Sequence, residues 1–111
     1  KENLNIMKQV KQSEFDAFIK SSDKPVLVDF FATWCGPCRA MHPILESAEK
    51  SEEGQKFEFV QVDVDQAPEL SARFGVMAVP TLAVFKDGEL VYKQAGVHQP
   101  QMLARVLKEH A

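Results

Sequence analysis

The sequence is poor in cysteine, lacks an excess of basic charge and contains no long hydrophobic run. Its 111 residues include two cysteines, and 13 basic against 16 acidic residues give a net charge of −3. No apolar stretch approaches the roughly 18 residues that a membrane-spanning helix needs. These shortages argue against a disulfide-rich secreted mini-domain, a membrane protein and a general nucleic-acid-binding domain.

The rest of the composition is that of an ordinary globular domain. Apolar residues make up 45% and charged residues 26% of the chain, close to the average for soluble proteins. A chain of this length has room for one hydrophobic core. We therefore expect a single domain over residues 1–111, with no nucleic-acid or membrane partner, and nothing in the sequence indicates more than a monomer.

The hydrophobic pattern alternates between strands and helices. Apolar runs of strand length predict five strands, at residues 5–10, 26–32, 57–64, 81–85 and 89–93. Helical spacing predicts four helices: one capped by Ser13, one after Cys38, one capped by Asp65 or a neighbour, and one near Pro100. The early crossover helices imply parallel strands, and Asp87-Gly88 implies a late hairpin. This predicts an α/β fold, a mixed five-stranded sheet flanked by four helices in the order β-α-β-α-β-α-β-β-α.

Cys35 and Cys38 stand where a strand gives way to a helix. A disulfide that closes so short a loop adds little stability, so reactivity explains the pair better. Unpaired N–H groups and the dipole at a helix N-terminus favour a thiolate at Cys35. Pro37 suits the first helical turn, which brings the sulfur of Cys38 close. We predict that Cys35 attacks a target disulfide and that Cys38 resolves the mixed disulfide.

A zinc site is the alternative interpretation of these two cysteines. Zinc takes four ligands, commonly from two such pairs or from one pair and two histidines. The chain offers one pair with His42 four residues beyond it, while His98 and His110 lie far away in sequence. This count of ligands disfavours zinc, and no metal is expected.

Asp29 places a carboxylate inside an apolar strand that ends near the cysteines. Burial of an unpaired carboxylate is costly and raises its pKa, which makes the group a proton donor or acceptor near neutral pH. Because the strand has the pattern of a central one, a catalytic acid–base role is favoured. The alternative is a side chain at a polar edge of the sheet or paired with a lysine.

The chain resembles the thioredoxin family over nearly its whole length. The motifs that carry this resemblance occur in order at 28–39, 43, 62–65, 74–76, 79–82, 85–88 and 96. The Trp-Cys-Gly-Pro-Cys segment at 34–38 is fairly specific by itself. Together with the Pro80-Thr81 pair and Gly96 it becomes highly specific.

The resemblance implies a thioredoxin fold and a thiol–disulfide oxidoreductase that reduces protein disulfides. Cys35 would be the exposed nucleophile and Cys38 the shielded resolving thiol, which Asp29 would help to deprotonate through water. Pro80 would be a cis proline beside the disulfide, against the alternative of a trans proline at a strand start. The backbone of Val79 would pair with an extended substrate strand. The implied docking surface is apolar and consists of Trp34, Gly36, Pro37, Val79, Pro80 and Gly96.

The resemblance also implies the source of electrons. No bound cofactor is expected, because NADPH would reduce the Cys35–Cys38 disulfide through a flavoprotein of the thioredoxin reductase type. Gly36-Pro37 resembles the reducing branch of the family, whereas oxidases and isomerases of this fold usually have a histidine there. Phe31 and Gln61 stand where many bacterial relatives have tryptophan and lysine. Without that lysine, the Asp29 anion is expected to be less stabilised.

Two other functions remain compatible with the sequence. One is a periplasmic or secreted reductase of the same family that serves a single pathway, which the compartment and the reduction potential would distinguish. The other is a binding module that uses the apolar face around Trp34 and Pro80 without redox chemistry, which serine at both cysteines would distinguish. A cytoplasmic disulfide reductase is the expectation, with disulfide-containing proteins as its targets.

Overall fold

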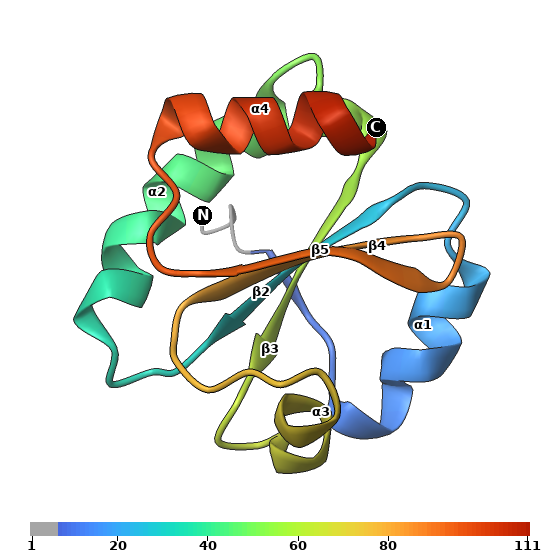
Figure 1. The fold of residues 1–111 in the computed structure, drawn as a ribbon, viewed down its shortest axis with the longest axis vertical. Helices are drawn as coiled ribbons and strands as arrows, with labels where there is room; N and C mark the ends of the chain where they lie inside the picture. The colour runs from blue at the N-terminus through green and yellow to red at the C-terminus, as the bar shows by residue number, and fades with distance from the viewer. Residues whose placement is uncertain (1–6) are drawn as a thin grey trace, which may run out of the picture.

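The computed structural model describes residues 7–111 and contains a mixed five-stranded sheet (Figure 1). The strands lie in the order β1-β3-β2-β4-β5. Parallel pairs join β1 (Lys8–Gln9) to β3 (Glu58–Asp63) and β3 to β2 (Val26–Phe31), whereas β4 (Thr81–Lys86) is antiparallel to both of its neighbours, β2 and β5 (Glu89–Ala95). The central strand is therefore β2, paired on both sides, as its continuous apolar pattern predicts.

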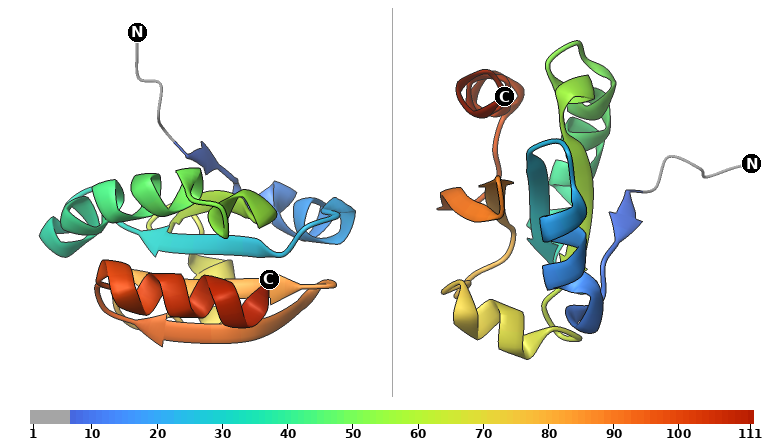
Figure 2. Two further views of the ribbon diagram at one scale, coloured as in Figure 1. Left: turned by 90° about the horizontal axis from the view of Figure 1, so that it is seen from above. Right: turned by 90° about the vertical axis from the view of Figure 1, so that its right-hand side faces the viewer.

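Helices cover both faces of this sheet (Figure 2). On one face pack α1 (Phe15–Ser21) and α3 (Pro68–Arg73), and on the other α2 (Gly36–Lys50) and α4 (Pro100–His110). Successive side chains of a strand point to opposite faces, so β2 contributes to both apolar cores. Among residues 7–111, no helix is long and apolar enough to cross a membrane.

The alternation along β2 decides where Asp29 points. Val28 and Phe30 pack in the core beneath α1 and α3, whereas Leu27 packs in the core beneath α2 and α4. Asp29 follows the same alternation as Leu27 and therefore faces the layer of α2. The strand then ends two residues beyond Asp29, at Phe31, directly before the cysteine segment. One strand thus places both the carboxylate and the cysteines at the same end of the sheet.

The predicted order of elements is confirmed, including the late hairpin. Asp87 and Gly88 have φ values of 54° and 83°, the left-handed conformation that a two-residue hairpin turn of type I′ requires at both positions. The strand expected at 5–10 is found at Lys8–Gln9, and residues 5 and 6 of that prediction lie outside the described residues.

The prediction that Ser13 caps the first helix is wrong. Ser13 lies inside a 3₁₀ turn, Gln12–Glu14, that precedes α1, and a carboxylate oxygen of Glu14 accepts the N–H of Lys11 at 3.2 Å. The expectation of a cap on α3 from Asp65 or a neighbour is wrong as well. The side-chain oxygen of Gln12 accepts the N–H groups of Glu69 at 2.8 Å and Leu70 at 3.3 Å. A residue 57 positions away therefore satisfies the first turn of α3.

Candidate active site

Cys35 occupies the N-cap position of α2, where the chain changes from extended to helical conformation. Its backbone is extended, with φ −91° and ψ 113°, and its Sγ accepts a hydrogen bond from the N–H of Cys38 at 3.1 Å. Pro37 stands in the first turn, where its missing N–H costs no helical hydrogen bond. The two cysteines form a disulfide, with Cα atoms 5.2 Å apart. The local sequence thus produces the predicted pair of adjacent sulfurs at a helix N-terminus.

Exposure does not separate the two cysteines in this oxidised state. Cys35 is 4% exposed and Cys38 is 6% exposed, so Cys38 is shielded as expected, whereas the expectation of an exposed Cys35 is wrong here. Both pack in a small apolar cluster with Ala32, which Phe31, Val64 and Val79 partly cover. What distinguishes the two sulfurs is their place on the helix, because the Sγ of Cys35 accepts an N–H of the first turn.

Two segments distant in sequence meet beside the disulfide. The Val79–Pro80 peptide bond is cis, as the resemblance implies, and the carbonyl oxygen of Val79 lies 3.6 Å from the Sγ of Cys35. The N–H of Gly96 donates to the carbonyl of Pro80 at 2.8 Å. Gly96 has a φ of 103°, which favours glycine. The structure therefore brings Val79, Pro80 and Gly96 together, and Val79 reaches Cys35.

Trp34 is an exposed side chain rather than a buried packing residue. It is 68% exposed, and its Nε1 donates to Oδ2 of Asp65 at 2.8 Å. Asp65 holds the indole over a neighbouring hollow of about 180 Å³, whose lining includes Met77 and Val79. Met77 is 94% exposed. Sequence reasoning missed Asp65 and Met77 because nothing in the local pattern connects either residue with Trp34.

Asp29 is buried and faces an amide rather than a lysine. Its side chain is 1% exposed, and Oδ2 accepts a hydrogen bond from Nε2 of Gln61 at 3.2 Å. Oδ1 has no hydrogen-bond partner in the part of the chain described. Burial raises the pKa of Asp29 from 3.8 to about 6, although the Gln61 hydrogen bond and the charge of His42 oppose this shift. The alternatives of a polar edge and a lysine pair are therefore wrong.

A pocket of about 280 Å³ opens beside Cys38. Its polar lining includes Gln61, the residue that holds Asp29, together with Arg39 and His42 from α2. Gln61 thus contacts the buried carboxylate and also lines this pocket. No group of three or more histidine, cysteine, aspartate or glutamate side chains within residues 7–111 is placed to hold a metal ion.

His98 supports the segment that carries Gly96. It is fully buried, with Nδ1 3.0 Å from the carbonyl oxygen of Gly96 and Nε2 2.9 Å from the hydroxyl of Tyr92. Burial lowers the pKa of His98, against the opposing effect of the Gly96 hydrogen bond. This role could not be predicted from the sequence, because a histidine far from the cysteines in sequence carries no pattern of its own.

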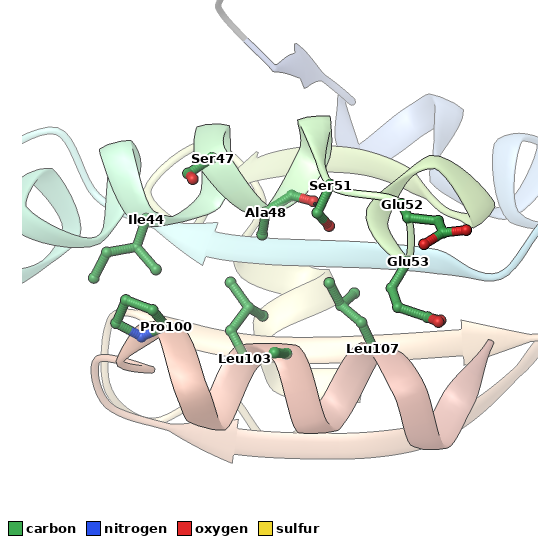
Figure 3. A pocket seen from close by; sticks show the side chains of 10 residues that line it. Ile44, Ser47, Ala48, Ser51, Glu52, Glu53, Pro100, Leu103 and Leu107 are labelled. Atoms are coloured by element: carbon green, nitrogen blue, oxygen red, sulfur yellow. Dashed lines mark hydrogen bonds between the residues drawn. The ribbon is translucent and has the colours of Figure 1, made fainter.

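A pocket of about 360 Å³ lies between α2 and α4 (Figure 3). Leu103 and Leu107 of α4 point across it toward Ala48 of α2 and toward Ser51, the residue that follows α2. Its lining holds neither cysteine nor histidine. The two cysteines lie instead at the other site, at the N-terminus of α2.

Known proteins match this chain along almost all of its length. The thioredoxin family model matches residues 6–109. A thioredoxin of Staphylococcus epidermidis is 46% identical over 102 residues, which cover 92% of this chain and 95% of the relative. Oxidised mitochondrial thioredoxin 3 of Saccharomyces cerevisiae is 35% identical with a TM-score of 0.82, covering 93% of this chain and 94% of the other. For Plasmodium falciparum thioredoxin the identity is 35%, the TM-score 0.84, and the coverage 95% and 100%.

Proposed function

The chain belongs to the thioredoxin family and is a thiol–disulfide oxidoreductase, and from this premise we propose that Cys35 is its nucleophile and Cys38 its resolving thiol. The observation that carries this division of roles is the N–H of Cys38 donating to the Sγ of Cys35 at 3.1 Å. A donated hydrogen bond and the positive end of a helix dipole both stabilise a thiolate. Cys38 lies within the first turn and has no such donor at its sulfur among the described contacts.

The identity of the family confirms the fold class and the activity predicted from the sequence. Neither a single-pathway periplasmic or secreted reductase nor a binding module without redox chemistry is favoured. A binding module without redox chemistry would leave the disulfide between Cys35 and Cys38 without a function, since a disulfide that closes so short a loop adds little stability.

The proposed exchange proceeds in two displacements at sulfur. The Cys35 thiolate attacks one sulfur of a target disulfide, forms a mixed disulfide and releases the other target sulfur as a thiolate. Cys38 then loses its proton to Asp29, and its thiolate attacks the Sγ of Cys35, which releases the second target sulfur. The target gains two electrons and this chain loses them, so the Cys35–Cys38 disulfide is the product state of the reaction.

Asp29 is suited to accept the proton of Cys38 because burial raises the pKa of its carboxyl to about 6. Above that pH the carboxyl is mostly ionised, yet it remains a stronger base than an exposed carboxylate. Gln61 holds one oxygen of Asp29 at 3.2 Å and also lines the pocket that contains Cys38. This arrangement supports a proton path through water in the pocket, with Gln61 beside it.

The surface around the disulfide supports the docking of an extended, partly apolar target segment. We assign to it the six residues predicted from the sequence, Trp34, Gly36, Pro37, Val79, Pro80 and Gly96. The carbonyl of Val79, 3.6 Å from the Sγ of Cys35, stands where a target backbone N–H would be held beside the reacting sulfur. Met77, 94% exposed beside Trp34, extends this surface.

Replacing Met77 with aspartate is expected to raise KM for a protein target about tenfold while leaving kcat nearly unchanged, as the loss of one apolar anchor does. Initial rates of insulin reduction over a range of insulin concentrations would measure both constants. The matched control is Met102→Asp, because Met102 is also exposed but belongs to α4, which lines neither pocket beside the cysteines. An equal rise in KM for both variants would argue against a docking role of Met77.

The family fixes the general partners, which are disulfide-containing targets and a reductase. Thioredoxin-family proteins carry no bound cofactor. We further propose that a flavoprotein of the thioredoxin reductase type supplies electrons from NADPH, and that the chain acts as a monomer with a single domain over residues 1–111. A reducing compartment keeps such a dithiol active, so we propose the cytoplasm as its location.

An insulin-precipitation assay with dithiothreitol tests the proposed function directly. Catalytic amounts of the protein are expected to shorten the delay before reduced insulin chains precipitate, because Cys35 attacks protein disulfides faster than the small thiol does. A delay equal to that of dithiothreitol alone would contradict the proposed reductase activity.

A further inference from the structure

We propose that His42 is a positioning residue that connects Asp29 with solvent and carries away the proton released when Cys38 attacks. The inference rests on the proposed function, in which Asp29 is the base for Cys38. His42 stands four residues after Cys38 on α2, and residues at this spacing lie on the same face of a helix. It therefore belongs to the side of α2 that carries the resolving thiol.

The pocket beside Cys38 joins His42 to the partner of Asp29. Cys38, His42 and Gln61 all line this pocket of about 280 Å³, and the amide of Gln61 donates to Asp29 at 3.2 Å. A water molecule occupies about 30 Å³ in the liquid, so the pocket has room for several. The side chain of His42 is itself 31% exposed, so it borders both the pocket and bulk solvent.

Two buried carboxylate oxygens lack hydrogen-bond partners among residues 7–111. One is Oδ1 of Asp29. The other is Oε2 of Glu46, which lies 3.4 Å from Nε2 of His42, within ion-pair distance when the imidazole is protonated. Buried acceptors without partners are uncommon and favour the transfer of a proton toward them. The imidazole of His42 thus lies beside the unpartnered carboxylate oxygen of Glu46 and lines the same pocket as Gln61, the partner of Asp29.

His42 is the lining residue with the right proton chemistry. Among the residues that line the pocket, the titratable ones are Cys38, Arg39 and His42. Arg39 keeps its proton and is held by the carbonyl of Thr33 at 3.2 Å, so it contributes a fixed positive charge. A histidine exchanges protons near neutral pH through two ring nitrogens.

Residues on three elements face His42 or interact with its charge, and the charged ones lie on α2 and β2. On α2 these are Arg39, Glu46 and Glu49, and His42 opposes the burial that raises the pKa of Glu49. On β2 the group is Asp29, whose pKa the charge of His42 lowers against the larger effect of burial. On β3 the facing residue is Gln61, which is uncharged. The charge of His42 therefore acts on the Asp29 carboxylate in the direction opposite to burial, as the smallest of the three effects.

The proposed transfer is balanced in protons and electrons. Cys38 gives its proton to Asp29. The electron pair of the Cys38 sulfur then forms the bond to the Sγ of Cys35, and the target sulfur leaves with the electrons of the mixed-disulfide bond. The proton on Asp29 passes through pocket water to the imidazole of His42, and the imidazolium releases it to bulk solvent. The target thiolate takes up one proton from solvent, so Asp29 and His42 end as they began.

The test follows the rate at which Cys38 resolves a preformed mixed disulfide at Cys35. The pH is varied from about 5.5 to about 8.5, which is about one unit below and about two units above the usual pKa of histidine. We expect His42→Gln to be slower by about tenfold near neutral pH, less than the roughly 10²-fold or more of a direct acid–base group. Free imidazole added to the buffer is expected to restore the lost rate. The variant His42→Lys keeps a positive charge but holds its proton at neutral pH, so it is expected to stay slow.

The control His110→Gln makes the same substitution on α4, outside the pocket, and is expected to keep the wild-type pH profile. A wild-type rate in His42→Gln, a full rate in His42→Lys, or a loss that imidazole does not restore would each overturn the inference. The variant Asp29→Asn distinguishes a failure of the inference about His42 from a failure of the proposed function. If Asp29→Asn is slow while His42→Gln is not, only the inference about His42 fails; if both resolve at the wild-type rate, the role of Asp29 fails with it.

Discussion

Replacing Cys35 with serine is expected to lower disulfide reduction by roughly 10³-fold or more, because the attacking sulfur is lost. The matched variant Cys38→Ser keeps the first displacement and loses the second. It is expected to accumulate mixed disulfides between Cys35 and its targets, because no second sulfur stands beside the Sγ of Cys35 to release them. Insulin reduction measures the first variant, and non-reducing electrophoresis followed by mass spectrometry measures the second.

The two serine variants control for one another, since each removes one sulfur from the same short loop. The double variant should neither reduce nor trap a target. Substantial turnover by Cys35→Ser would contradict the role of Cys35 as nucleophile. Mixed disulfides trapped through Cys38 rather than Cys35 would reverse the two assignments, and would show that the N-cap position does not select the attacking sulfur.

Replacing Asp29 with asparagine is expected to stabilise the fold at neutral pH while slowing resolution by Cys38. Burial raises the folded-state pKa of Asp29 from 3.8 to about 6, so the protonated carboxyl is the form that the fold favours. The contribution of protonated Asp29 to the stability of the fold is fully present below pH 3.8. It is lost as the pH rises through about 6. Asparagine carries no charge at any of these pH values, so its advantage over the wild type reaches about 3 kcal/mol above pH 7.

The measurement is the difference in the free energy of unfolding between Asp29→Asn and the wild type, from urea titrations at pH 4, 6 and 8. The difference should be near zero at the lowest pH and largest at the highest. The variant is compared with the wild type at each pH because the titration of His98 changes the stability of both proteins, in the direction opposite to that of Asp29. Burial lowers the pKa of His98, so its contribution to stability is lost as the pH falls.

Exposed Asp23 provides the matched control for this substitution, and Asp23→Asn is expected to leave the unfolding free energy almost unchanged at all three pH values. A stability gain by Asp29→Asn that did not vary with pH would contradict the titration of a buried carboxyl. An unchanged resolution rate in the same variant would remove Asp29 from the proposed proton path.

The sequence predicted the parts of the fold that local pattern determines. The continuous apolar run of β2 indicated a central strand, and β2 is paired with β3 and β4. The position of Asp29 within that run indicated its burial, because a central strand has no polar face. The strand-to-helix junction likewise placed the cysteines at the N-terminus of α2. Each of these predictions depends on neighbours within about ten residues.

The features that the sequence did not reveal depend on contacts across the chain. Asp65 binds the indole of Trp34 instead of capping α3, and Gln12 supplies that cap from 57 residues away. The low exposure of Cys35 also arises from tertiary packing, since Val79 belongs to the loop before β4 and Val64 follows β3. No local pattern of residues could indicate these pairings.

The pH dependence of alkylation of the two thiols in the reduced protein tests the central claim most directly. Iodoacetamide reacts with thiolates, so its rate at each cysteine, resolved by mass spectrometry, reports where that cysteine ionises. We predict that Cys35 is modified first and at a lower pH than free cysteine, whose thiol ionises near about 8.5. Reaction of both thiols with the pH profile of free cysteine would contradict activation by the N-terminus of α2.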